Sequence, residues 1–153
     1  METKIGKILG LFHAATGKKM DNRQYGNRLL MQKLVFLGQK LGIDFGYYYV
    51  WYLKGPYSVQ LASDAFNVDN KTSEEPLSEK EKQVLQELRK AFGKDLTNEE
   101  KLELLGSLVF IKKEWKITER EAIVEKLRSL KPWFSKETTE EMLDKIEKSQ
   151  LFN

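Results

Sequence analysis

Residues 43–58 read IDFGYYYVWYLKGPYS and form the one stretch of this chain whose pattern predicts an extended structure. The stretch holds five of the six tyrosines and one of the three tryptophans. Aromatic and β-branched residues are enriched in strands, and here they occupy both alternating sets of positions. We therefore expect a short β-ribbon that ends at the Gly55-Pro56 turn. Because a two-stranded ribbon is only marginally stable alone, it must pack on helices.

The sequence before this stretch predicts two helices. Residues 3–16 place apolar side chains at helical spacing, and Gly17 follows as a stop signal. A longer helix is expected over residues 21–41, with Asp21 and Gln24 as a capping box. Its apolar positions cover more than one face, which predicts a central, buried helix.

The sequence after the stretch alternates cap signals, apolar stripes and stops. Capping boxes are expected at Ser78 and Glu81, Thr97 and Glu100, Thr118 and Glu121, and Thr138 and Glu141. The agreement of these signals predicts a mainly α-helical protein of about seven helices with one short β-ribbon. We expect residues 1–153 to form a single domain, within which two lobes, 1–66 and 77–153, would be joined by the polar loop 67–76.

Composition argues against several classes of function. The chain of 153 residues has no cysteine and one histidine, His13, so it lacks the ligands of an ordinary zinc site and any thiol nucleophile. No glycine-rich phosphate loop or nucleophilic serine elbow is present. We therefore expect no enzymatic activity, no metal and no cofactor. Without a signal-peptide core or an apolar run near the ~20 residues of a membrane span, we expect a cytoplasmic location and no membrane contact.

Two interpretations compete for the aromatic stretch, which would either fill the core or present a recognition surface. Tyrosine and tryptophan are enriched at binding hot spots, and there are more rings than one face of a ribbon needs. We expect one alternating set, including Tyr48 and Tyr52, to be partly exposed, and such exposure would also permit a homodimer. The predicted partner-binding residues are Tyr47, Tyr48, Tyr49, Trp51, Tyr52, Lys54, Gly55, Pro56 and Tyr57.

The distribution of charge supports an alternative hypothesis, a nucleic-acid-binding regulator. The net charge is +3, but residues 1–60 hold nine basic against three acidic side chains, which leaves the remaining residues with seventeen against twenty. Cations that hold phosphates beside aromatics that stack bases are typical of single-strand binding. The candidate nucleic-acid contacts are Lys18, Lys19, Arg23, Arg28 and Lys33.

The order of three motifs resembles the SocA/Panacea antitoxin-like domain over roughly residues 1–66. The motifs are the run RLLMQKLVFL at 28–37, the aromatic segment 45–51 and GPYS at 55–58. The residues that carry the resemblance are Lys33, Leu34, Phe36, Trp51, Gly55 and Pro56. It implies an α-rich, non-catalytic domain that binds protein partners, often a toxin encoded beside it. Residues 77–153 match nothing in that family. The expected function is a protein-binding module, antitoxin-like or an adaptor, with a toxin-like or regulatory partner.

Overall fold

The computed structural model describes residues 4–68 and 72–153 of the chain. In these residues it has seven α-helices and one short 3₁₀ helix, which confirms the mainly helical prediction. None of the described helices is both long enough and apolar enough to cross a bilayer. In chain order the elements are α1 (Ile5–Thr16), α2 (Tyr25–Lys40), α3 (Val59–Phe66), α4 (Glu79–Phe92), η1 (Gly93–Thr97), α5 (Glu99–Lys113), α6 (Arg120–Leu130) and α7 (Lys136–Ser149).

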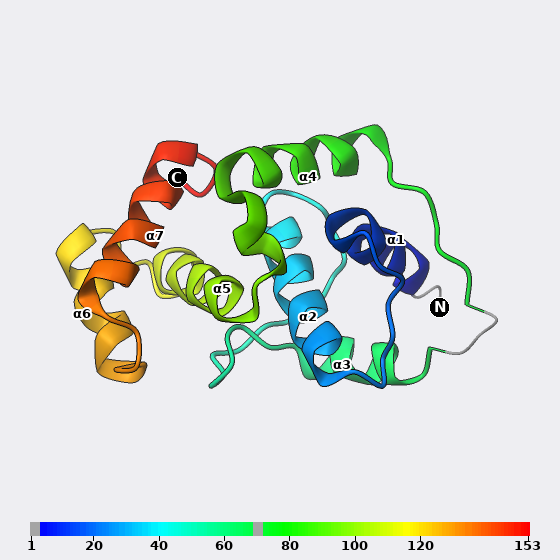
Figure 1. Cartoon of the computed structure of the whole chain (residues 1–153), viewed down its shortest axis with the longest axis horizontal. Coiled ribbons are helices and arrows are strands. Elements are labelled where there is room, and N and C mark those ends of the chain that lie inside the picture. Colours follow the sequence, from blue (N-terminus) through cyan, green and yellow to red (C-terminus); the bar gives the residue numbers. More distant parts are fainter. Residues whose placement is uncertain (1–3, 69–71) are drawn as a thin grey trace.

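Helices α2 and α5 lie at the centre and pack against each other (Figure 1). Every residue of 29–38 in α2 and of 102–111 in α5 is buried. A helix that is apolar on all sides must be surrounded by other elements. Accordingly, α1, α3 and α4 pack on α2, while α6 and α7 pack on α5. One cluster of buried apolar side chains runs through both central helices, so both halves of the sequence contribute to the same core.

Several helix ends follow the predicted signals. Gly17 ends α1 in the left-handed conformation, with φ of 74° and its N–H bonded to the carbonyl of His13. Ser78 and Glu81 form the predicted reciprocal capping box of α4. Two predicted starts are displaced along the chain: Asn98 caps α5 in place of Thr97, and Ser135, three residues before the predicted Thr138, caps α7. The side chains of Ser78, Asn98 and Ser135 each accept a hydrogen bond from a backbone N–H of the first turn, as an N-cap should.

The predicted starts of α2 and α6 are wrong. Helix α2 begins at Tyr25, because the Asp21 carboxylate accepts bonds from the backbone N–H of Arg23 at 3.0 Å and from its guanidinium at 3.1 Å. This local turn competes with capping. Helix α6 follows Glu119, which makes no side-chain cap bond.

No strand is assigned over residues 43–58, which we call the extended segment. It contains one isolated antiparallel bridge, in which Val50 and Tyr57 exchange N–H···O bonds of 2.9 and 3.1 Å. The predicted ribbon is thus reduced to a single residue pair, and the segment forms a projecting loop (Figure 1). Of the polar loop predicted over 67–76, residues 69–71 lie outside the described residues.

Candidate functional site

The extended segment turns alternate side chains outward and inward. Tyr48 is 82% exposed, and Val50 and Tyr52 are 40% and 41% exposed, whereas Tyr49 is 8% exposed. Tyr57, paired with Val50 across the bridge, packs its ring against that of Tyr52, with centroids 4.7 Å apart. We call Tyr48, Val50, Tyr52 and Tyr57 the outward face. The expected exposure of Tyr48 and Tyr52 is confirmed.

Two of the predicted partner-binding tyrosines hold the segment in place instead. The Tyr49 hydroxyl donates to the backbone carbonyl of Gln32 at 2.7 Å, and its ring meets Phe36 edge-on at 5.1 Å. Burial raises the pKa of Tyr49 well above its ordinary value. The Tyr47 hydroxyl donates to the Asp64 carboxylate at 2.6 Å, and burial together with this bond raises its pKa. The prediction that Tyr49 contacts a partner is wrong for this structure, because its ring is enclosed.

Trp51 joins the segment to the far end of α5. Its ring stacks on Trp115 with centroids 4.8 Å apart and meets Phe110 edge-on at 5.8 Å. The ammonium nitrogen of Lys131 lies 4.9 Å from the centre of the same ring. Cations are attracted to the face of an indole ring, so Trp51 covers a charge as well as apolar surface.

A group of charged side chains is buried where α2, α5 and the end of α6 meet. We call Lys33, Glu103 and Lys131, together with the Ser107 hydroxyl, the buried ionic cluster, which is not one of the predicted sites. Lys131 donates to Glu103 at 3.2 Å and to Ser107 at 2.9 Å. Lys33 donates to the backbone carbonyl of Leu29 at 3.1 Å. Glu103 forms its ion pair with Lys131, while Lys33 has no carboxylate of the described residues within ion-pair distance. Burial lowers the pKa of both lysines, that of Lys33 to about 8.

Glycines and a proline enclose the stem of Lys33. Gly55 has φ of 112°, and a Cβ added there would lie 2.7 Å from Cε of Lys33 and 3.6 Å from Cα of Glu103. A Cβ on Gly106 would lie 3.0 Å from the ring of Pro56. The turn therefore sits so close to α2 and α5 that glycine is favoured at both positions, and at Gly55 the positive φ favours it as well. Gly55 and Pro56 are buried, so the prediction that they contact a partner is wrong. They pack against α2 and α5 and hold the extended segment in place.

The motifs that carry the family resemblance meet at this place. Lys33 comes from α2, Gly55 and Pro56 from the turn, and Trp51 from the segment that covers Lys131. Their shared role here is to lock the extended segment onto the central helices. Lys54, beside the turn, is exposed and stays available for a partner.

Four of the five predicted nucleic-acid contacts are at least partly exposed, and two of them, Lys19 and Arg23, line the same pocket. Lys18, Lys19 and Arg23 are exposed, and Arg23 is paired with the Asp21 carboxylate. Lys33 is 2% exposed, so its prediction as a phosphate contact is wrong: the side chain lies in the slot between α2 and α5. These positions leave the hypothesis with fewer free cations than the sequence indicated.

Arg28 borders a pocket of about 320 Å³ between α2 and α3, which we call the aromatic groove. Its apolar lining includes Tyr25, Leu29, Met31, Tyr57, Ala62 and Phe66. Gln32 lies at its floor, with both ends of its amide bonded to the backbone of Ser58 at 2.8 and 2.9 Å. Tyr57 belongs to both the groove and the outward face, so the two surfaces are continuous.

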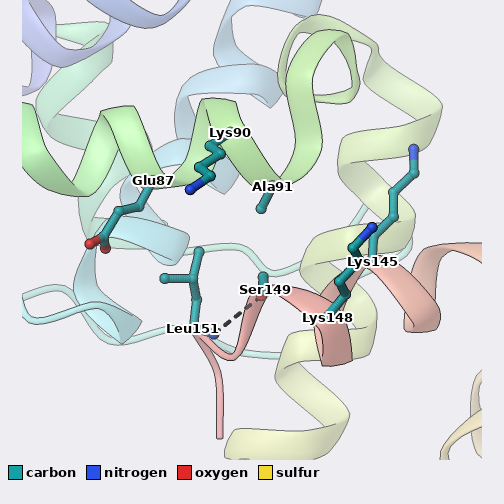
Figure 2. Close-up of a pocket in the computed structure, with 7 residues that line it drawn as sticks. All are labelled: Glu87, Lys90, Ala91, Lys145, Lys148, Ser149 and Leu151. Atoms are coloured by element: carbon teal, nitrogen blue, oxygen red, sulfur yellow. Dashed lines mark hydrogen bonds between the residues drawn. The ribbon is translucent and has the colours of Figure 1, made fainter.

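A second pocket, of about 550 Å³, lies between α4 and α7 (Figure 2). Lys90, Lys145 and Lys148 line it around Ala91, and Lys145 pairs with Asp95 at 2.7 Å. Lys90 and Lys148 stand in the last turns of their helices, where a positive charge favours the helix dipole. This placement explains the lysines without a ligand.

His13 is exposed, and its ring nitrogen lies 2.9 Å from the carboxylate of Glu74. Within residues 4–68 and 72–153, no group of three or more histidine, cysteine or acidic side chains is placed to hold a metal ion.

No family model, curated protein or solved structure matches the chain. The resemblance of the first 66 residues to the SocA/Panacea antitoxin-like domain therefore stays a prediction.

Proposed function

We propose that this chain is a non-catalytic protein-binding module that recognises its partner with the outward face of the extended segment. The observation that supports this proposal is an exposed set of aromatic side chains on a firmly anchored backbone. Tyr48 and Tyr52 offer large rings with few rotatable bonds, which is the composition of a binding hot spot. The Tyr48 ring is 82% exposed and therefore contributes little to the core.

The anchoring of this face is what makes it suitable for binding. The Gly55-Pro56 turn is fixed over Lys33, while Tyr49 and Trp51 hold the other side of the segment against the central helices. A face that is already ordered pays less conformational entropy on association than a flexible loop would. The resemblance to the antitoxin-like family adds a partner class, a toxin-like or regulatory protein encoded beside this one.

A test is to co-express the chain with the product of the neighbouring gene and to measure the complex by calorimetry. The double variant Tyr48→Ala with Tyr52→Ala is expected to weaken binding at least about tenfold. Trp133→Ala is the matched control, because Trp133 is 55% exposed but lies on the α6–α7 connection. Absence of a complex, or equal losses in both variants, would count against the proposal.

The alternative, a nucleic-acid-binding regulator, predicts a different result. A complex with oligonucleotides should weaken steeply as salt rises and should depend on Lys18 and Lys19. Salt-dependent shift assays on single- and double-stranded oligonucleotides separate it from the proposed function.

A further inference from the structure

We infer that the aromatic groove binds an acidic segment of a protein partner. The segment inserts one large apolar side chain between Tyr25 and Phe66 and sets a carboxylate against Arg28. This inference rests on the proposed function, because it specifies the chemistry of a partner bound at the surface that adjoins the outward face.

The shape of the groove fits one bulky side chain. Tyr25 at the start of α2 and Phe66 at the end of α3 are 53% and 75% exposed, and both line the pocket. Its floor is formed by buried residues of the two helices, Leu29 and Ala65 among them. At about 320 Å³ the groove lies at the small end of the range for ligand pockets, about 300–1,000 Å³. It therefore takes a single anchor residue rather than a whole helix.

Arg28 supplies the charge preference. One nitrogen of its guanidinium donates to the carbonyl of Asn22 at 2.6 Å, and the group lies 5.6 Å from the centre of the Tyr25 ring. These contacts hold the guanidinium beside the groove and leave other N–H donors unused. No carboxylate pairs with Arg28 among the described residues, in contrast to Arg23, which binds Asp21. A planar guanidinium that is already positioned is well suited to bind a carboxylate through two hydrogen bonds.

A protein side chain fits this groove better than a nucleobase does. A base carries donors and acceptors on its edges, and leaving them unpaired in a pocket is costly. The polar side chain at the floor is Gln32, whose amide is already fully engaged with Ser58. An apolar side chain makes no such demand and gains from the burial of Tyr25 and Phe66.

The experiment is an NMR titration of the full chain with three probes. The first is a synthetic peptide with one central tryptophan flanked by aspartates, the second replaces the aspartates by lysines, and the third is an oligothymidine. We expect the acidic peptide to shift backbone amides of α2 and α3 around the groove. Phe66→Ala and Arg28→Gln should each weaken this binding about tenfold, because each removes one of the two recognition elements. Trp133→Ala should leave it unchanged, and Arg28→Lys should restore part of the affinity.

Equal binding of the acidic and basic peptides would overturn the inference, as would an unchanged affinity in Phe66→Ala. Oligothymidine binding that shifts the same amides more strongly than either peptide does would assign the groove to nucleic acid instead. Circular dichroism of each variant establishes that it is folded, and Phe66 is exposed enough for its loss to leave the core intact. A co-expressed partner that depends on Tyr48 and Tyr52 but not on Phe66 would keep the proposed function and refute this inference. Peptide binding at the groove, with no complex formed by the co-expressed partner, would support this inference and count against the proposed function.

Discussion

Replacing Lys33 by methionine is expected to raise the free energy of unfolding at pH 7. The change removes a buried charge but keeps an unbranched apolar stem in the slot between Gly55 and Gly106. Burial lowers the pKa of Lys33 from 10.5 to about 8, which at about 1.4 kcal/mol per tenfold change in acidity corresponds to about 3 kcal/mol. The variant also loses the hydrogen bond to Leu29, worth about 1 kcal/mol. We therefore expect a net gain of about 1–2 kcal/mol, in the range measured when buried ions are replaced by apolar residues.

The pH dependence of the same variant follows from proton binding. Between about pH 8 and pH 10.5 the unfolded chain keeps the proton of Lys33 that the folded chain has released. Because the unfolded state then binds more protons, the stability of the unmodified protein rises with pH across this window. The variant lacks this group, so its advantage shrinks as pH rises. The lowered pKa of Lys131 acts equally in both proteins, and the raised pKa values of Tyr47 and Tyr49 act only above about pH 10.

The measurement is urea denaturation at pH 7 and at about pH 9.5, followed by tryptophan fluorescence. Trp51 stacked on Trp115 makes the signal sensitive to release of the extended segment. Lys131→Met is the contrasting variant: it leaves Glu103 buried without its cation and should cost about 3 kcal/mol or more. If Lys33→Met is less stable than the unmodified protein at pH 7, and the unmodified protein is equally stable at both pH values, then the charge of Lys33 stabilises the fold and this reasoning is wrong.

Three further changes test the anchoring and the helix caps. Gly55→Ala should lower the free energy of unfolding by more than the roughly 1–3 kcal/mol of backbone strain, because the added Cβ also meets the Lys33 side chain. Gly17→Ala has open space around it and should show the backbone strain alone; thermal melts of both variants make the comparison. Tyr49→Phe should cost about 0.5–1.5 kcal/mol in urea denaturation, since it removes a buried hydrogen bond to a carbonyl of α2, and an equal loss in the exposed Tyr48→Phe would contradict this explanation. Ser78→Ala should cost about 1 kcal/mol and speed hydrogen exchange in the first turn of α4; unchanged exchange there would show that the capping box is not needed.

Helix content and several helix ends were accessible from sequence because they depend on local signals. The glycine after α1 and the serine and glutamate of the α4 capping box act within one helical turn, and both signals operate as predicted. The start of α2 was not accessible in the same way. The Asp21 side chain can either cap a helix or close a turn with Arg23, and the sequence does not say which interaction prevails.

The buried ionic cluster was missed because it depends on contacts between distant segments. Lys33 and Glu103 look like polar positions on two helix surfaces, and 70 positions separate them in the chain. A signal was nevertheless present. Lys33 is the one charged residue among the ten buried positions 29–38, and Glu103 is the one charged residue among the ten buried positions 102–111. One charged residue in a mostly apolar run of a helix, with an opposite charge in a second such run, indicates a buried ionic site. The exposure of Tyr48 and Tyr52, by contrast, followed from alternation along one segment and was predictable.

The contact between Gly55 and the stem of Lys33 has a consequence for how this sequence can diverge. A methyl group at position 55 meets that stem, and a shorter side chain at position 33 would remove the clash but not the backbone strain of a φ of 112°. Position 55 is therefore held to glycine by its own backbone, whereas position 33 can change as long as an apolar side chain fills the slot. Homologous sequences should keep glycine at 55 even where the lysine at 33 is replaced, so the turn would carry the longer evolutionary record of the two.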